Sequence, residues 1–225
     1  LRRVGPVDLL LLVAPPLFWA GNFIVGRAVR GEFPPLTLSF GRWALALLFL
    51  LPFAWAPMRR DWPHYWRHRW GVLRLSLAGV VAFNSLVYVG LQWTTAGNGL
   101  LLNSFIPILI LLFGALFYRQ PLRLAQGAGL ALSFCGVLAI LFHGEVSRLA
   151  RLDFSTGDLA VFVAMVSWAF YTLWQRVVPP TIDRIGLMGV QILAALPVLG
   201  LMALGEHLSG ASPRWSPDTL AALGY

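Results

Sequence analysis

Long hydrophobic stretches alternate with short polar segments along almost the whole chain. A helix needs about twenty mostly apolar residues to cross a bilayer. Seven stretches meet this requirement, at approximately residues 7–28, 36–56, 72–92, 97–117, 124–142, 159–178 and 185–204. An eighth begins near Asp218 and is cut off at Tyr225, so we expect the natural protein to continue beyond this chain. The pattern predicts an all-α polytopic membrane protein with seven complete helices and the start of an eighth.

The first hydrophobic stretch occurs a second time later in the chain. Residues 8–29 read DLLLLVAPPLFWAGNFIVGRAV, and residues 158–178 read DLAVFVAMVSWAFYTLWQRVV. The matching residues are Asp8 with Asp158, Trp19 with Trp168, Arg27 with Arg176 and, at a spacing of 145, Pro52 with Pro197. Internal similarity over such a period is typical of proteins built from repeated structural units.

The repeat predicts how the chain is organised. We expect a first five-helix repeat at residues 1–143, a linker at 144–156 and a partial second repeat at 157–225. Because five is an odd number, the second copy enters the membrane from the opposite side. This predicts two inverted five-helix repeats and ten helices in the natural protein. Many secondary transporters have such repeats and hold their substrate near the middle of the bilayer between them, so transport is the favoured function.

The positive charges help to orient the chain. All seventeen are arginines, and they gather at the ends of the hydrophobic stretches. With the N-terminus in the cytoplasm, the cytoplasmic segments hold eleven arginines and the opposite side holds five. The positive-inside rule therefore favours a bacterial inner-membrane protein with a cytoplasmic N-terminus. The same placement argues against nucleic acid as the partner of this basic chain; the lipid bilayer and a small-molecule substrate are expected instead, and the oligomeric state is open.

The composition excludes several other classes. Hydrophobic residues make up 58% of the chain and charged residues 12%, which is too apolar for a soluble domain. A nucleotide-binding P-loop needs a lysine, and the sequence has none. Asp61, His64 and His68 are close in sequence, but a metal site would need a further ligand that is not evident. We therefore expect no metal, no cofactor and no enzymatic activity.

Polar and aromatic residues inside the hydrophobic stretches are the candidates for a substrate site. In the first stretch, Pro15 and Pro16 favour a kink or an interruption, and Trp19 and Asn22 follow on one face. The whole predicted set is Trp19, Asn22, Asn84, Tyr88, Asn98, Trp168, Tyr171 and Gln191. Aromatic rings and neutral hydrogen-bonding groups suit a small solute with an apolar body and a polar head. Hydrogen bonding between helices is the alternative for each of these residues, above all for Asn84, Asn98, Asn103 and Gln191.

One charged residue lies inside a predicted span. Arg42 is about six residues into the second stretch, roughly 9 Å deep at 1.5 Å per residue. It either extends to the nearer interface or serves as a counter-charge for an anionic group such as a carboxylate. The seven complete stretches contain no Asp or Glu near their middle, so no proton-carrying carboxylate is evident.

Three segments carry a family resemblance: WAGNFIVGRAV, WAFYTLWQRVV and GLQWTTAGNGLLLNSFIPILILLFGALFYRQPLRLAQGAGLALSFCGVLAILF. They resemble the EamA-type branch of the drug/metabolite transporter superfamily. Arg42 in SFGRWALALLFL is similar to an arginine common early in the second helix of that family. The resemblance implies ten helices in two inverted repeats, a central cavity and export of amino acids or other metabolites. The many aromatic residues are most similar to those of aromatic amino-acid exporters of the YddG type. In one departure, the link Tyr118–Pro121 lacks the acidic residue usual in the family.

These observations together predict a secondary transporter that exports small amphipathic metabolites, above all aromatic or neutral amino acids, by alternating access. The alternatives within transport are export of cationic drugs and export of other metabolites such as nucleotide sugars. A membrane enzyme and a non-transporting scaffold are the alternatives outside transport. An enzyme would need clustered carboxylates or histidines near the interface, and His143 with Glu145 is a weak candidate for such a cluster.

Overall fold

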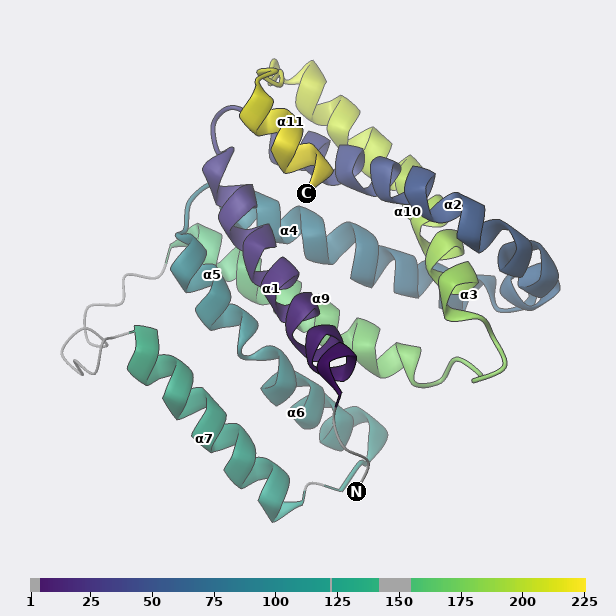
Figure 1. Ribbon diagram of the computed structural model, residues 1–225, viewed down its shortest axis with the longest axis vertical. Coiled ribbons are helices and arrows are strands. Elements are labelled where there is room, and N and C mark those ends of the chain that lie inside the picture. Colours follow the sequence, from purple (N-terminus) through teal and green to yellow (C-terminus); the bar gives the residue numbers. More distant parts are fainter. Residues whose placement is uncertain (1–4, 122, 142–154) are drawn as a thin grey trace.

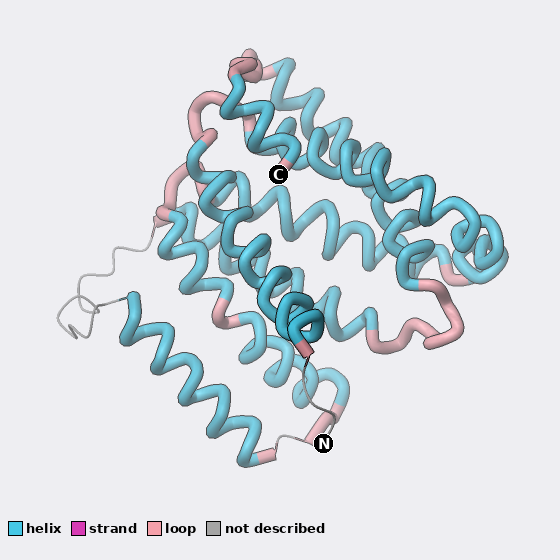
Figure 2. Tube along the Cα trace, viewed as in Figure 1, coloured by secondary structure: helices cyan, strands magenta, loops and turns pink. Residues whose placement is uncertain are grey.

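The computed structural model describes residues 5–121, 123–141 and 155–225, and every regular element within them is a helix. The elements are α1 (Pro6–Ala28), α2 (Pro35–Arg67), α3 (Arg69–Leu75), the π-helix η1 (Ser76–Ala82), α4 (Phe83–Gly90), α5 (Ala96–Asn103), α6 (Ile106–Tyr118), α7 (Leu124–Leu141), α9 (Thr156–Gln175), α10 (Arg184–Leu208) and α11 (Pro217–Gly224). Their succession is shown in Figures 1 and 2.

Six of the seven predicted spans are confirmed as helices long and apolar enough to cross a membrane. They cover Val7–Ala28, Pro35–Arg67, Arg69–Gly90, Ala96–Tyr118, Thr156–Gln175 and Arg184–Leu208. The remaining predicted span, at 124–142, is α7, whose apolar part within the described residues, Leu124–Gly136, is shorter. The predicted linker falls mostly on residues outside the described ranges, so the boundaries of the two repeats stay a prediction.

Helices α1 and α9, which carry the repeated motif, begin in the same way. The Asp8 carboxylate accepts a hydrogen bond from the backbone N–H of Gly5 at 2.9 Å. The Asp158 carboxylate accepts one from the backbone N–H of Ser155 at 2.8 Å. Each aspartate occupies the third position of its helix, where a carboxylate satisfies a free N–H group and favours the positive end of the helix dipole.

The expected interruption of the first span at its two prolines is absent from the described helix. Helix α1 continues through Pro15 and Pro16 from Pro6 to Ala28. The fourth span is the one that breaks, because α5 ends at Asn103 and α6 restarts at Ile106 with Pro107 in its first turn. Proline is favoured there, since the first-turn N–H groups have no partner within the helix. The third span runs without a break from α3 through η1 into α4.

Helices α2 and α10, the second helices of the two predicted repeats, lie side by side and antiparallel (Figure 1). The direction follows from contacts at both ends. Glu206 near the end of α10 accepts hydrogen bonds from the backbone N–H groups of Leu36 and Thr37 at the start of α2. Asp61 near the end of α2 accepts one from the backbone N–H of Asp183, just before α10. Opposite directions are what inverted repeats require.

Helices α4 and α9 pack against each other in the middle of the molecule, α1 lies in front of them, and α7 lies at one edge (Figure 1). The largest buried cluster joins α1, α4 and α9, with Phe23, Val87, Leu91 and Met165 among its members. Large apolar side chains on the outer surface, such as Leu10 and Phe53, are more than half exposed. Apolar residues on the outside and a packed helical interior fit a protein surrounded by lipid.

Candidate functional site: a central aromatic cavity

A cavity of about 480 Å³ lies between α1, α2, α4, α9 and α11. Its volume is in the range of sites that take small molecules. The lining residues are Phe18, Trp19, Asn22, Arg42, Trp43, Leu45, Ala46, Phe49, Phe83, Asn84, Tyr88, Trp168, Leu223, Gly224 and Tyr225. Five of the eight predicted site residues are among them: Trp19, Asn22, Asn84, Tyr88 and Trp168.

The two tryptophans of the repeated motif meet at one wall of this cavity. The rings of Trp19 and Trp168 are 4.8 Å apart between centroids and nearly perpendicular, at 82°. Phe83 of α4 packs against both, at 5.7 Å from Trp19 and 4.6 Å from Trp168. Edge-to-face contacts of this kind hold aromatic rings in defined positions. The result is an aromatic wall to which the first helices of both predicted repeats contribute.

Polar groups stand next to the aromatic wall. The Tyr88 hydroxyl donates a hydrogen bond of 2.8 Å to the side-chain oxygen of Asn22. Asn84 lines the cavity one turn before Tyr88 on the same helix. Trp19 donates its indole N–H to the side-chain oxygen of Asn103 at 3.1 Å, which fixes the orientation of its ring.

Among the described residues that line the cavity, Arg42 alone is cationic. Its guanidinium lies 5.8 Å from the ring centroid of Tyr88 and 5.7 Å from that of Tyr225. These distances are within the range of a cation–π interaction. Its Nη1 atom is buried and has no hydrogen-bond partner among the described residues. Of the two interpretations of Arg42, the structure favours the inward-facing one, because the residue lines the cavity and its guanidinium lies over the rings of Tyr88 and Tyr225.

Residues 7–142 of the chain match the family described as the EamA-like transporter family. The chain belongs to this family. The resemblance to this family is thereby confirmed, and the protein is a multi-pass membrane protein whose described residues form the helices expected of an EamA-like chain.

The EamA-like chain is similar in sequence to several curated proteins, of which three are described here. An "Uncharacterized transporter" of Archaeoglobus fulgidus is 30% identical over 219 residues, covering 96% of this chain and 73% of the relative. The "Uncharacterized transporter YyaM" of Bacillus subtilis is 26% identical over 174 residues, covering 74% of this chain and 55% of YyaM. The "Inner membrane protein YtfF" of Escherichia coli is 28% identical, covering 89% of this chain and 66% of YtfF. The chain thus spans about half to three quarters of these relatives. No solved structure matches it with significant similarity.

The other three predicted site residues lie outside the lining of the cavity. Asn98 donates its side-chain N–H to the Asp158 carboxylate at 3.3 Å, and Thr94 donates its hydroxyl to the same oxygen. Tyr171 donates its hydroxyl to the side-chain oxygen of Gln191 at 3.1 Å, which joins α9 to α10. For Asn98 and Gln191 the structure shows the alternative role, hydrogen bonding between helices.

Several lining residues were not among the predicted site residues. Phe83 and Trp43 read as ordinary apolar positions, since an aromatic residue facing a cavity has the same pattern as one facing a packed core. Leu223 and Tyr225 belong to α11 and the residue that follows it. Arg42 carried a signal, a charge inside an apolar stretch, and the sequence left its direction open.

The histidines near the end of α2 show no metal-binding arrangement. Within the part of the chain that the structure describes, no three potential ligands come together. The rings of His64 and His68 stack on one another at 4.3 Å. The Asp61 carboxylate is held by the Arg60 guanidinium at 2.9 and 3.1 Å.

Proposed function

We propose that this protein is a secondary transporter of the bacterial inner membrane, with its N-terminus in the cytoplasm, that exports small amphipathic carboxylates. Aromatic and bulky neutral amino acids are the favoured substrates. The observation that carries this proposal is Arg42, whose buried Nη1 atom has no hydrogen-bond partner among the described residues.

A carboxylate is the natural partner of this arginine. A buried cationic donor without an acceptor is costly, and a guanidinium binds a carboxylate through hydrogen bonds strengthened by charge. Within the described lining of the cavity no Asp or Glu stands near Arg42 to take this place. A substrate carboxylate in the cavity would supply this acceptor once the Arg42 side chain turns its Nη1 atom toward the cavity, with the helices in place.

The walls of the cavity suit the rest of an amino acid. Trp19, Phe83 and Trp168 present aromatic surface to an apolar side chain. Asn22 and Asn84 offer amide oxygens that can accept hydrogen bonds from an ammonium group. The volume of about 480 Å³ leaves room for a bulky side chain together with some water.

Alternating access fits the position of the cavity. Trp19 and Trp168 come from the first helices of the two predicted repeats, so movement of one repeat against the other changes the wall that the substrate touches. The substrate then stays between the two repeats while first one end of the cavity and then the other is open.

The test is flux in proteoliposomes that contain the whole protein. Labelled tryptophan, phenylalanine and leucine are compared with tryptamine, which has the same ring as tryptophan but no carboxylate, each with and without a pH gradient. Arg42→Gln is expected to lower the flux of amino acids at least tenfold, since a charged hydrogen bond contributes about 1.5–3 kcal/mol. Arg59→Gln, on the same helix but exposed, is the matched control and is expected to keep wild-type flux.

Two further variants test the walls. Trp168→Ala and Tyr88→Ala are expected to impair transport while the protein still inserts and folds. Wild-type flux in both would remove these residues from the site. Tryptamine carried as well as tryptophan, with Arg42→Gln fully active, would overturn the carboxylate proposal and favour cationic drugs. If no amino acid is carried by folded protein, nucleotide sugars become the next substrates to try.

A further inference from the structure

Helix α2 is longer than the hydrocarbon layer of a membrane is thick. Its 33 residues extend over roughly 50 Å at 1.5 Å per residue, whereas the layer measures about 30 Å. The last turns of α2 therefore lie at the level of the lipid headgroups, and α3 begins directly after them. In the predicted orientation this is the cytoplasmic surface of the membrane, where anionic lipids create a negative potential.

The segment at this end, residues 59–74, is rich in positive charge. It contains a single acid, Asp61, and five exposed arginines: Arg59, Arg60, Arg67, Arg69 and Arg74. Asp61 is paired with Arg60, and no other ion pair occurs within the described part of the chain. The remaining four arginines of the segment therefore present positive charge that no acid compensates.

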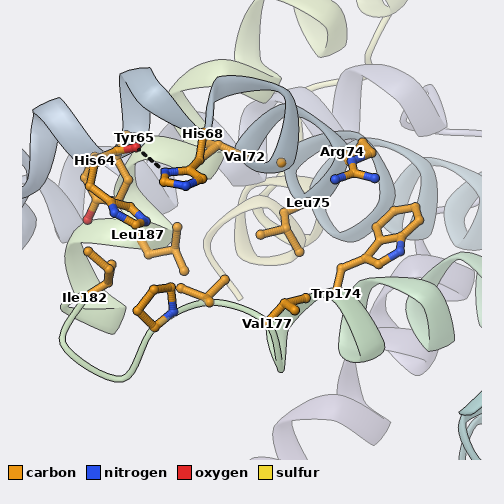
Figure 3. A pocket seen from close by; sticks show the side chains of 13 residues that line it. His64, Tyr65, His68, Val72, Arg74, Leu75, Trp174, Val177, Ile182 and Leu187 are labelled. Carbon is orange, nitrogen blue, oxygen red and sulfur yellow. Dashed lines mark hydrogen bonds between the residues drawn. The ribbon is translucent and has the colours of Figure 1, made fainter. Parts of the chain in front are cut away.

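The two sides of this segment differ. On the inner side, Tyr65 and Val72 belong to a buried cluster with Ile182 and Leu187, beside a small apolar cavity of about 180 Å³ (Figure 3). The other side carries three tryptophans that are about half to two thirds exposed, Trp62, Trp66 and Trp70. Tryptophan is enriched where a membrane protein meets the headgroups, so this exposed side faces lipid.

An apolar groove of about 270 Å³ lies on the exposed side, between α2, α3 and α10. Its lining residues are Trp62, Tyr65, Trp66, Arg69, Trp70, Val72, Leu73, Val190 and Ala194. Val190 and Ala194 are roughly 9 and 15 Å along α10 from its cytoplasmic start. The groove thus extends from the headgroups through the hydrocarbon of one leaflet, which is about 15 Å deep.

Arg69 alone is charged among the described residues that line this groove. Its guanidinium lies 5.8 Å from the ring centroid of Trp66 and 5.8 Å from that of Trp70, so two indole rings hold it by cation–π contacts. One of its N–H groups donates to the Trp66 carbonyl oxygen at 3.4 Å, which leaves the others for a ligand. The planar fork of guanidinium donors matches the oxygens of a phosphate.

We propose that this groove binds one anionic phospholipid of the cytoplasmic leaflet. The lipid phosphate accepts hydrogen bonds from Arg69 between Trp66 and Trp70, and one acyl chain lies against Val190 and Ala194. A lipid fits better than a soluble anion, because beyond Arg69 the groove offers apolar surface. The site does not depend on the transported substrate, since its lining shares no residue with that of the central cavity.

Two pairs of substitutions test the lipid site. Arg69→Gln removes the charge in the groove, and Arg67→Gln removes an exposed charge two residues away that does not line it. Ala194→Phe fills the deep part of the groove without a change of charge. Ala203→Phe is its control, because Ala203 is also partly buried on α10 but lies outside the linings of the groove and of the central cavity.

The measurement is native mass spectrometry of the whole protein, with equal amounts of anionic phosphatidylglycerol and zwitterionic phosphatidylethanolamine that carry the same acyl chains. The wild type is expected to retain one phosphatidylglycerol in preference to phosphatidylethanolamine. Arg69→Gln is expected to weaken this binding about fivefold, the contribution of one arginine at an anionic surface, and Arg67→Gln much less. Ala194→Phe is expected to abolish the binding, and Ala203→Phe to leave it unchanged.

Three results would overturn the proposal. Equal losses in Arg67→Gln and Arg69→Gln would show only the diffuse attraction of a basic surface. Binding that survives Ala194→Phe would mean that no acyl chain lies in the groove. Excess glycerol 1-phosphate, which has the phosphate but no acyl chain, is expected to leave the lipid in place, and displacement of the lipid would identify a site for soluble phosphates instead.

Discussion

The two ends of the α2–α10 pair are joined by contacts that are related but unequal. Glu206 follows Asp61 at a spacing of 145, the same spacing that relates Pro197 to Pro52. At one end Glu206 accepts hydrogen bonds from Leu36 N–H at 3.1 Å, from Thr37 N–H at 2.7 Å and from the Thr37 hydroxyl at 2.8 Å. At the other end Asp61 accepts a single bond across the pair, from Asp183 N–H at 3.2 Å.

The difference lies in how each helix begins. The residue before α2 is Pro34, which makes no side-chain hydrogen bond to the helix, so the free N–H groups of α2 depend on Glu206 from the neighbouring helix. Helix α10 is capped by its own Asp183, which accepts from Ile185 N–H and Gly186 N–H. The Glu206 end is therefore the more strongly joined, and the Asp61 end should separate first.

The largest expected effect is that of Glu206→Ala. It leaves the Leu36 and Thr37 N–H groups without their acceptor, and loss of hydrogen bonds to a charged group costs about 1.5–3 kcal/mol. The free energy of unfolding in detergent should fall by about that amount, with a lower melting temperature. Glu32→Ala, an exposed acid in the loop before α2, is the control and should change little.

Asp61→Asn should have a smaller effect. It weakens the pair with Arg60, whose side chain is 63% exposed, and exposed pairs contribute about 0–1 kcal/mol. The asparagine oxygen still accepts from Asp183 N–H. The same unfolding measurement checks this prediction, and a loss larger than that of Glu206→Ala would reverse the comparison of the two ends.

Thr37→Val should have the smallest effect. It removes the hydroxyl bond to Glu206 and leaves both backbone bonds in place, so a loss of about 0.5 kcal/mol is expected for one modest hydrogen bond. Amide hydrogen exchange sharpens the result, because the Thr37 N–H should stay protected in this variant and lose its protection in Glu206→Ala. Equal exchange in the two variants would show that the hydroxyl, and not the carboxylate, holds this end.

Much of the fold could be predicted because the membrane requires long apolar helices, and their sequence pattern is strong. The internal repeat predicted the pairing of particular residues as well as the number of helices. It paired Trp19 with Trp168, and the structure brings their rings to 4.8 Å. Matching residues of two repeated helices can meet when they lie at the same depth and the two helices face a common space. Helices α1 and α9 do so, because both line the central cavity.

The site was harder to predict because a helical face does not identify its neighbour. Asn98 faces Asp158 since the α4–α5 connection approaches the start of α9 very closely. Two glycines permit this approach: a Cβ on Gly157 would lie 2.8 Å from Thr94 N, and one on Gly90 would lie 2.7 Å from Gly157 O. The sequence shows both glycines, but it does not show that they face each other.

The π-helical segment η1 sets the rotational phase of the third span. A π-helical turn holds one residue more than an α-helical turn, and each residue of an α-helix advances by about 100°. Deleting one residue between Ser76 and Ala82 would turn α4 by about that angle relative to α3, and Tyr88 would leave Asn22 while Leu75 kept its place. The length of η1 thus fixes which side chains of α4 face the central cavity, while the side chains of α3 keep their places.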